Sequence, residues 1–241
     1  MKLNSLIFLI LIYNGLFAQN ELGFVKNNSR FQLGVNYSGD YCYRFISNRD
    51  ADPTSEMIIK LRNEIEIPVF GYTTGLNFKY NLNNRIGFQL GLKYSRKGYQ
   101  TKKSILFAAD PTDPAVADFG KFIHHYYFID IPLLVNYTVG QKKVKFISSF
   151  GLVNNIGIKQ TNTSVLYFSD HIHKHIMDSD FDYSRYNISS FLSSGIVYNL
   201  NDKLSIRIEP YFMINTLKII KTPIEGNLYS GGLDVSIWFN L

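Results

Sequence analysis

Regular alternation between apolar and polar residues, sustained over eight separate segments, constrains the fold of this chain most. A period of two places every second side chain on the same side of an extended strand. The segments run over about 30–44, 69–82, 85–99, 122–139, 144–159, 187–200, 203–215 and 228–241. Those at 144–159 and 187–200 alternate less strictly, because serine residues enter their apolar side. The pattern predicts an all-β protein with eight strands.

The connections between these segments alternate strictly between short and long. The short ones, rich in Asn, Gly and Asp, lie at 81–84, 140–143 and 201–202, and the long ones at roughly 45–68, 100–121, 160–186 and 216–227. Antiparallel neighbours joined in this way place every long connection at the same end of the sheet. Membrane barrels with short periplasmic turns and long outer loops have this rhythm. We therefore predict an eight-stranded antiparallel up-and-down transmembrane β-barrel.

The beginning of the chain has the three-part pattern of a secretory signal peptide. Lys2 gives a positive start, an unbroken apolar run covers 6–12, and the small Ala18 precedes Gln19. Such a run is too short to span a bilayer as a helix. The sequence predicts a signal peptide over 1–18 and a barrel domain over 19–241. Since Cys42 is the only cysteine, an intramolecular disulfide and a cysteine-built zinc site are excluded.

The polar and apolar sides of the strands indicate which side faces lipid. The polar sides are dominated by Gly, Ser, Asn and Gln, and only 18% of all residues are charged. A surface facing water would carry many more Lys and Glu. Aromatic residues gather near strand ends on the apolar side, namely Phe31, Tyr80, Tyr94, Tyr127, Tyr137, Tyr229 and Phe239. This favours an outer-membrane barrel with a polar interior; the alternative is a soluble periplasmic lipocalin-like carrier with its apolar side inward.

One strand resembles a known family. Residues 127–137 read YFIDIPLLVNY, which resembles a strand of the PorT-like outer-membrane β-barrel proteins of Bacteroidetes. The Phe-Ala-Gln end of the signal segment, the pair Phe150-Gly151 and the final Trp-Phe-Asn-Leu at 238–241 are similar to that family too. The resemblance implies an outer-membrane location and insertion by the barrel-assembly machinery. It implies no particular activity.

The histidines provide a candidate metal site. His171, His173 and His175 alternate along the chain, so in an extended segment their imidazoles share one side. Clustered imidazoles bind zinc, copper or nickel. His124 and His125 fall at the same outer end of the predicted barrel. The alternative is a solvated polar loop whose histidines bind nothing.

Charged residues on the polar sides predict ion pairs inside the barrel. They are Lys93, Asp130, Arg207, Glu209 and Asp234. Charges in a narrow lumen of low dielectric constant need partners. Lys93 and Asp130 fall at similar height on neighbouring strands, and we predict that they pair. A path for protons or ions is the alternative, although eight strands leave little open lumen.

The expected function is that of a non-enzymatic structural or surface-binding protein of the outer membrane, without a cofactor. The rival hypothesis is a small lipid-modifying enzyme, in which His124 or His125 would act with Ser148 or Ser190; no spacing motif supports it. Expected partners are membrane lipid, the barrel-assembly machinery and an extracellular ligand or protein. The formal net charge is +6, but Lys and Arg are scattered and no nucleic-acid motif occurs, so nucleic acid is not an expected partner.

Overall fold

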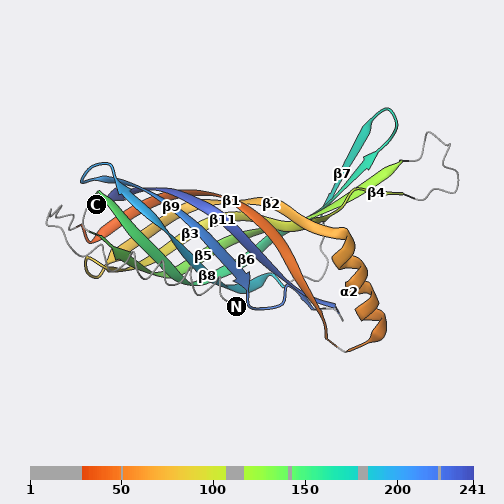
Figure 1. Ribbon diagram of the computed structural model, residues 1–241, viewed down its shortest axis with the longest axis horizontal. Coiled ribbons are helices and arrows are strands. Elements are labelled where there is room, and N and C mark those ends of the chain that lie inside the picture. The colour runs from red at the N-terminus through yellow and green to blue at the C-terminus, as the bar shows by residue number, and fades with distance from the viewer. Residues whose placement is uncertain (1–28, 50, 107–116, 141–142, 179–183, 222–223) are drawn as a thin grey trace, which may run out of the picture.

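The computed structural model describes residues 29–49, 51–106, 117–140, 143–178, 184–221 and 224–241. Within these ranges, eight antiparallel strands form a closed ring (Figure 1). The ring consists of β1 (Phe31–Asn48), β2 (Glu66–Asn81), β3 (Ile86–Thr101), β5 (Phe119–Val139), β6 (Val144–Tyr167), β8 (Tyr186–Asn199), β9 (Leu204–Asn215) and β11 (Ile224–Asn240). Pairing of β1 with β11 closes it. The predicted barrel is confirmed, and the predicted signal peptide at 1–18 lies outside the described residues.

The other described elements lie in the long connections. They are α2 (Pro53–Ile65), β4 (Ser104–Ile105), β7 (Ile172–Asp178) and β10 (Ile220–Lys221). β5 and β6 continue beyond the ring as a paired extension, which β4 joins along β5 and β7 along β6. We call the projecting part the outer sheet: β4, residues 119–122 of β5, residues 159–167 of β6, and β7. It projects from the same end of the barrel as α2 (Figure 1).

Asparagine side chains shape two of the short turns at the opposite end. The Asn83 side-chain oxygen accepts hydrogen bonds from the backbone amides of Arg85 and Ile86, both at 2.8 Å. The Asn201 oxygen accepts equivalent bonds from Lys203 and Leu204, both at 2.9 Å. Such bonds fix a tight reversal of the chain, which is why these positions favour Asn. The end with the short turns corresponds to the periplasmic end of an outer-membrane barrel.

The barrel has a polar interior and an apolar exterior. Along β1, Asn36, Ser38 and Asp40 point inward and are buried, whereas Val35 and Tyr37 point outward and are exposed. The other ring strands repeat this arrangement. A water-soluble barrel requires the reverse, so the alternative of a lipocalin-like carrier is wrong. An apolar exterior of this kind is stable only in contact with lipid.

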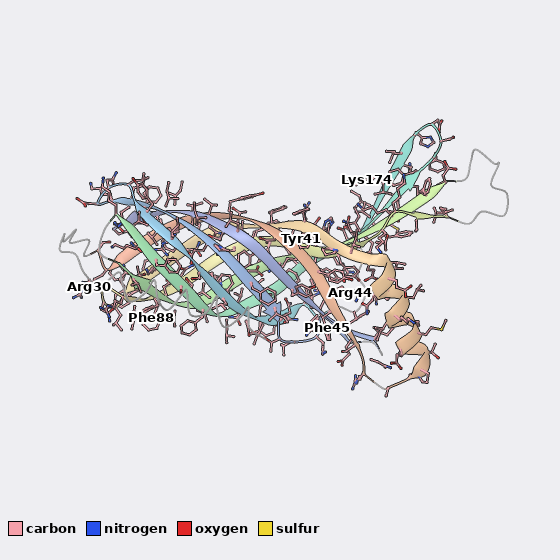
Figure 2. All side chains as sticks on the ribbon, viewed as in Figure 1. Arg30, Tyr41, Arg44, Phe45, Phe88 and Lys174 are labelled. Carbon is pink, nitrogen blue, oxygen red and sulfur yellow. The ribbon has the colours of Figure 1, made fainter. Side chains whose placement is uncertain are left out.

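Two belts of aromatic side chains border the apolar exterior. At the periplasmic end the ring of Phe31 lies 5.3 Å from that of Tyr80. At the outer end the ring of Tyr41 lies 5.3 Å from that of Phe70, and Figure 2 shows Tyr41 on the barrel wall toward that end. From Phe31 to Tyr41 the strand climbs roughly 25 Å along the barrel axis, at about 3.3 Å per residue and a tilt of about 40°. This height matches the hydrocarbon layer of an outer membrane.

Helix α2 is attached to the outer rim of the barrel by charged contacts. Its first turn is capped by Asp52, whose carboxylate accepts the Ser55 amide at 2.9 Å. At its other end, the buried carboxylate of Glu66 accepts hydrogen bonds from Arg62 at 2.7 Å and Arg44 at 2.5 Å. This helix was not predicted from the sequence. No helix in the described ranges is both long and apolar enough to cross a bilayer.

Candidate functional site

Two carboxylates organise the hydrogen bonds at mid-height in the lumen. Asp40 on β1 accepts hydroxyl hydrogen bonds from Ser38, from Thr73 at 2.5 Å and from Tyr211 at 2.6 Å. All of these donors come from inward positions of the ring strands. Such donors replace the water that a buried carboxylate would otherwise need. Among the described residues, the Asp40 carboxylate is thus held by hydroxyl groups without an ion pair.

The second carboxylate, Asp130 on β5, has a cationic partner other than the predicted one. Asp130 lies directly opposite Lys93 in the β3–β5 register, as expected. Its ion pair is nevertheless with Lys97, whose ammonium nitrogen lies 3.0 Å away. Lys93 instead reaches Asp234 on β11, at 3.7 Å. The predicted Lys93–Asp130 pair is therefore wrong, because a lysine stem in so narrow a barrel reaches strands across the lumen as easily as its neighbour.

Arg207 and Glu209 were each expected to have an ion-pair partner in the lumen. Neither has one in the described part of the chain. Glu209 accepts hydrogen bonds from the hydroxyls of Ser149 at 3.1 Å and Ser193 at 3.0 Å. The Arg207 guanidinium lies over the ring of Trp238 at 3.7 Å and donates to Gln32 at 2.7 Å. Arg207 and Glu209 lie two residues apart on one strand, and each finds neutral partners on other strands. Both serine donors lie on the inward, polar side of their strands, whereas the serines that interrupt the apolar side of 144–159 and 187–200, such as Ser148 and Ser190, face outward.

The lumen is filled at mid-height and toward its outer end. A cavity of about 20 Å³ lies among Lys93, Asp130 and Asp234, which is room for about one water molecule. Nearer the outer rim, the remaining space beside Arg44 and Tyr126 is about 10 Å³. A cluster of buried apolar side chains closes that end: Tyr99, Tyr126, Phe128, Ile219 and Leu228. Neither of these two spaces can hold a solute larger than a water molecule.

A larger cavity of about 250 Å³ opens at the periplasmic end. The basic residues lining it are Arg30, Lys79, Lys145 and Arg207, and no Asp or Glu is among its lining residues. Of these four, only Arg207 was singled out from the sequence. The sequence could have indicated Lys79 and Lys145, because each lies a few residues from a short turn on the polar side of its strand. We call this space the mouth cavity.

The predicted metal ligands do not converge. His171 directly precedes β7, and its ring stacks on Phe168 at 4.5 Å while its Nδ1 lies 2.6 Å from Asp170. That hydrogen bond lowers the pKa of the Asp170 carboxyl. His173 and His175 lie on β7 and are exposed. No group of three or more His, Cys, Asp or Glu side chains within the described ranges is arranged to hold a metal ion.

The serine–histidine pairs considered from the sequence are not assembled either. His124, at the outer rim, bonds through Nδ1 to the Asn162 side chain at 2.7 Å. Ser148 pairs with Tyr137 near the periplasmic end and contacts Ser194 on the outside of the barrel. Ser190 also faces outward and is exposed. Neither hydroxyl is within reach of a histidine at the rim.

Comparison with known proteins gives one informative match. No curated protein matches the chain. Among solved structures, Neisserial surface protein A is 13% identical, with a TM-score of 0.44 over 88% of this chain and 98% of that one. OprG from Pseudomonas aeruginosa is 11% identical, with a TM-score of 0.41 over 88% and 95%. The outer membrane protease OmpT from Escherichia coli is 7% identical, with a TM-score of 0.41 over 92% and 99%.

The sequence profile described as "Outer membrane protein beta-barrel domain" matches residues 17–196. The match covers most of the ring strands, from β1 into β8. It agrees with the closed ring, the apolar exterior and the aromatic belts, and it sets the location in the outer membrane. The chain belongs to the outer membrane protein beta-barrel domain family.

Proposed function

We propose that this protein is a PorT-like, non-enzymatic barrel of Bacteroidetes type that binds a ligand at the cell surface. The PorT-like assignment is supported by the strand at 127–137. There Leu133 points to lipid and Pro132 points inward against Gly91, where an added Cβ would lie 2.9 Å from the proline ring. The motif thus combines a lipid-facing leucine with a proline that fills the lumen.

The filled lumen is the observation that carries the proposal. Asp40, Asp130 and Asp234 are held by hydroxyl, amide and ammonium donors at mid-height, and the cavity beside Asp130 and Asp234 is about 20 Å³. A pore would need a continuous polar channel. Because the lumen is filled at these levels, we place ligand binding at the ends of the barrel, and the outer sheet is the largest described structure at the cell-surface end.

The outer sheet has the features of a protein-binding surface. Its exposed apolar side chains are Ile105, Phe119, Phe122, Ile172, Ile176 and Met177. Charges of both signs lie among them, including Lys174 and Asp178, which suits a protein better than a polyanion. Within the described chain, β7 pairs only with β6, so its second edge is free. An extended peptide can add to such an edge through backbone hydrogen bonds.

Absence of enzymatic activity is part of the proposal. Support comes from the rim histidines, since the His124 side chain is bonded to Asn162 and the His171 side chain to Asp170. We further propose insertion by the barrel-assembly machinery. It would act on the last strand, β11, whose Phe239 faces lipid and which closes the ring against β1. Nucleic acid is not a proposed partner.

Peptide selection tests the surface-binding proposal. A library of random peptides is panned against the purified barrel in lipid nanodiscs and then compared with the double variant Ile172→Ser/Ile176→Ser. We expect enriched extended apolar peptides that bind the wild type and lose binding to the variant. Leu92→Ser, on the lipid-facing wall, is the matched control and should bind as the wild type does. Peptides that bind the double variant equally well would contradict the outer sheet as the binding surface.

Lipid analysis tests the alternative that the protein is a lipid-modifying enzyme. Membranes of a deletion strain and of the complemented strain are compared by mass spectrometry of their lipids. We expect identical acyl chains and headgroups. A modified lipid that disappears on deletion and returns on complementation would establish the lipid-modifying enzyme instead.

A further inference from the structure

The mouth cavity collects positive charge without an acidic counterpart. Its basic residues come from separate parts of the ring: Lys79 from β2, Lys145 from β6, Arg207 from β9 and Arg30 from the segment before β1. Figure 2 shows Arg30 at the end of the barrel opposite Lys174. A concave site lined by one sign of charge, with walls of low dielectric constant, concentrates ions of the opposite sign.

Arg207 is the most buried of these cations and is only partly satisfied. Its side chain is 1% exposed and lies on the ring of Trp238. One nitrogen donates to Gln32, while Nε and Nη1 have no hydrogen-bond partner within the described chain. Glu209, two residues along β9, is occupied by serine hydroxyls. Glu209 and Asp234 attract Arg207 without coming within ion-pair distance. A buried guanidinium with free donors and no directly bound carboxylate attracts an oxyanion.

Lys79 brings a second buried cation to the same cavity. It is 5% exposed, and its ammonium makes no hydrogen bond or ion pair with the described residues. Its stem lies against Gly87 on the neighbouring strand, where an added Cβ would come within 2.5 Å of the lysine Cε. The chain therefore leaves room for a cation that Glu209 attracts from a distance but that has no ion-pair partner among the described residues. Lys145 and Arg30 line the same space.

We propose that the mouth cavity binds a small oxyanion, a phosphate or carboxylate group presented from the periplasm, between Arg207 and Lys79. A volume of about 250 Å³ is below that of typical cavities for drug-sized ligands, so the ligand or its buried part is small. Lys145 and Arg30 add attraction at the entrance. This site lies at the opposite end of the barrel from the outer sheet and does not depend on the binding proposed there.

Fluorescence of Trp238 provides a direct test, because it is the only tryptophan of the chain and contacts Arg207. The mature protein in detergent is titrated with sodium phosphate, with sodium succinate and with sodium chloride at matched ionic strength. We expect a saturable change in emission with phosphate or succinate and none with chloride. A response to phosphate alone or to succinate alone identifies which oxyanion source the site selects. Absence of a saturable response to both would overturn the proposal.

Variants establish where the anion binds. Lys79→Met should weaken binding by roughly tenfold or more, which is the usual effect of losing one charge-assisted hydrogen bond. Lys174→Met, which removes the same charge at the other end of the barrel, should bind like the wild type. Unfolding midpoints in chloride verify folding, and Lys79→Met should not lower them because it removes an unpaired buried charge. Equal affinity in the wild type, Lys79→Met and the double variant Lys79→Met/Lys145→Met would refute the site.

Discussion

The ammonium nitrogen of Lys97 lies 3.0 Å from a carboxylate oxygen of Asp130, and both side chains are buried in the lumen. Ser95 and Asn155 donate to the same carboxylate. Loss of one partner of a buried ion pair typically costs about 3–5 kcal/mol. We expect Lys97→Met to lower the free energy of unfolding in detergent by about 3 kcal/mol, measured by urea titration. Lys93→Met should cost less, because its 3.7 Å contact to Asp234 is longer and less buried.

A double variant identifies the pair. Asp130→Leu together with Lys97→Met removes the desolvation penalty along with the attraction, so it should recover much of the loss of the single Lys97→Met variant. Asp130→Leu together with Lys93→Met should not. If the Lys93 combination alone showed this recovery, the pairing derived from the structure would be incorrect.

Neighbouring leucines on β5 test which side faces lipid. Leu133 is 52% exposed on the exterior, and Leu134 is 4% exposed beside the mid-height cavity. Glutamine is close to leucine in size, so the same substitution compares the two environments. Leu133→Gln places an amide in hydrocarbon and should cost about 1–3 kcal/mol. Leu134→Gln finds polar neighbours in the lumen and should cost less. The comparison uses unfolding in lipid vesicles, and equal costs would contradict the orientation of the strand.

Cysteine labelling tests the orientation of the barrel. The only native thiol, Cys42, is fully buried, so a membrane-impermeant maleimide reports on an introduced cysteine. Lys174→Cys on β7 should be labelled on intact cells. Asn83→Cys, in a short turn, should be labelled only after the outer membrane is permeabilised. The reverse pattern would place the short turns outside the cell.

The stability of helix α2 should depend on pH through its N-terminal cap residue, Asp52. The hydrogen bond from the Ser55 amide lowers the pKa of the Asp52 carboxyl below its usual value. A carboxyl with a lowered folded pKa contributes stability that is fully present above its unfolded pKa of about 3.9. That contribution is lost as the pH falls through the lower folded value. Hydrogen exchange of residues 53–65, corrected for intrinsic rates, should therefore accelerate below about pH 4.

Asp52→Asn is the matched control for that measurement. Asparagine caps helices well without titrating, so the corrected exchange of α2 in this variant should be nearly independent of pH. Asp52→Ala should show fast exchange at neutral pH already. An unchanged pH response in Asp52→Asn would mean that a group other than Asp52 controls the helix.

The ring strands were predictable because each has one side in lipid and one side in a polar lumen. This contrast requires apolar and polar residues to alternate along each strand, and the lengths of the connections indicate which strands are neighbours. The register of Lys93 opposite Asp130 follows from the same information. Helix α2 and β7 were not predicted, since both lie in long connections where exposed residues of mixed character leave no regular period.

The side-chain contacts inside the lumen could not be predicted from the sequence, for a different reason. Lys93 reaches Asp234, and Arg207 reaches Gln32, across strands that are far apart in the chain. These contacts depend on how closure of the ring orients the inward side chains toward one another. Alternation of apolar and polar residues predicts that a residue faces the lumen. It does not predict which of several long side chains binds a given carboxylate.

Closure of the ring by β1 and β11 also determines when the barrel can form. Gln32 is opposite Asn240 and Asn48 is opposite Ile224, so the last seam joins the two ends of the barrel sequence. Contacts at such separation are slow to form, because the chain between them must first be ordered. A nascent chain that lacks β11 keeps two unpaired strand edges, which hydrocarbon does not tolerate. We therefore expect the barrel to close only after β11 has been synthesised, with its two strand edges sealed together in the final step.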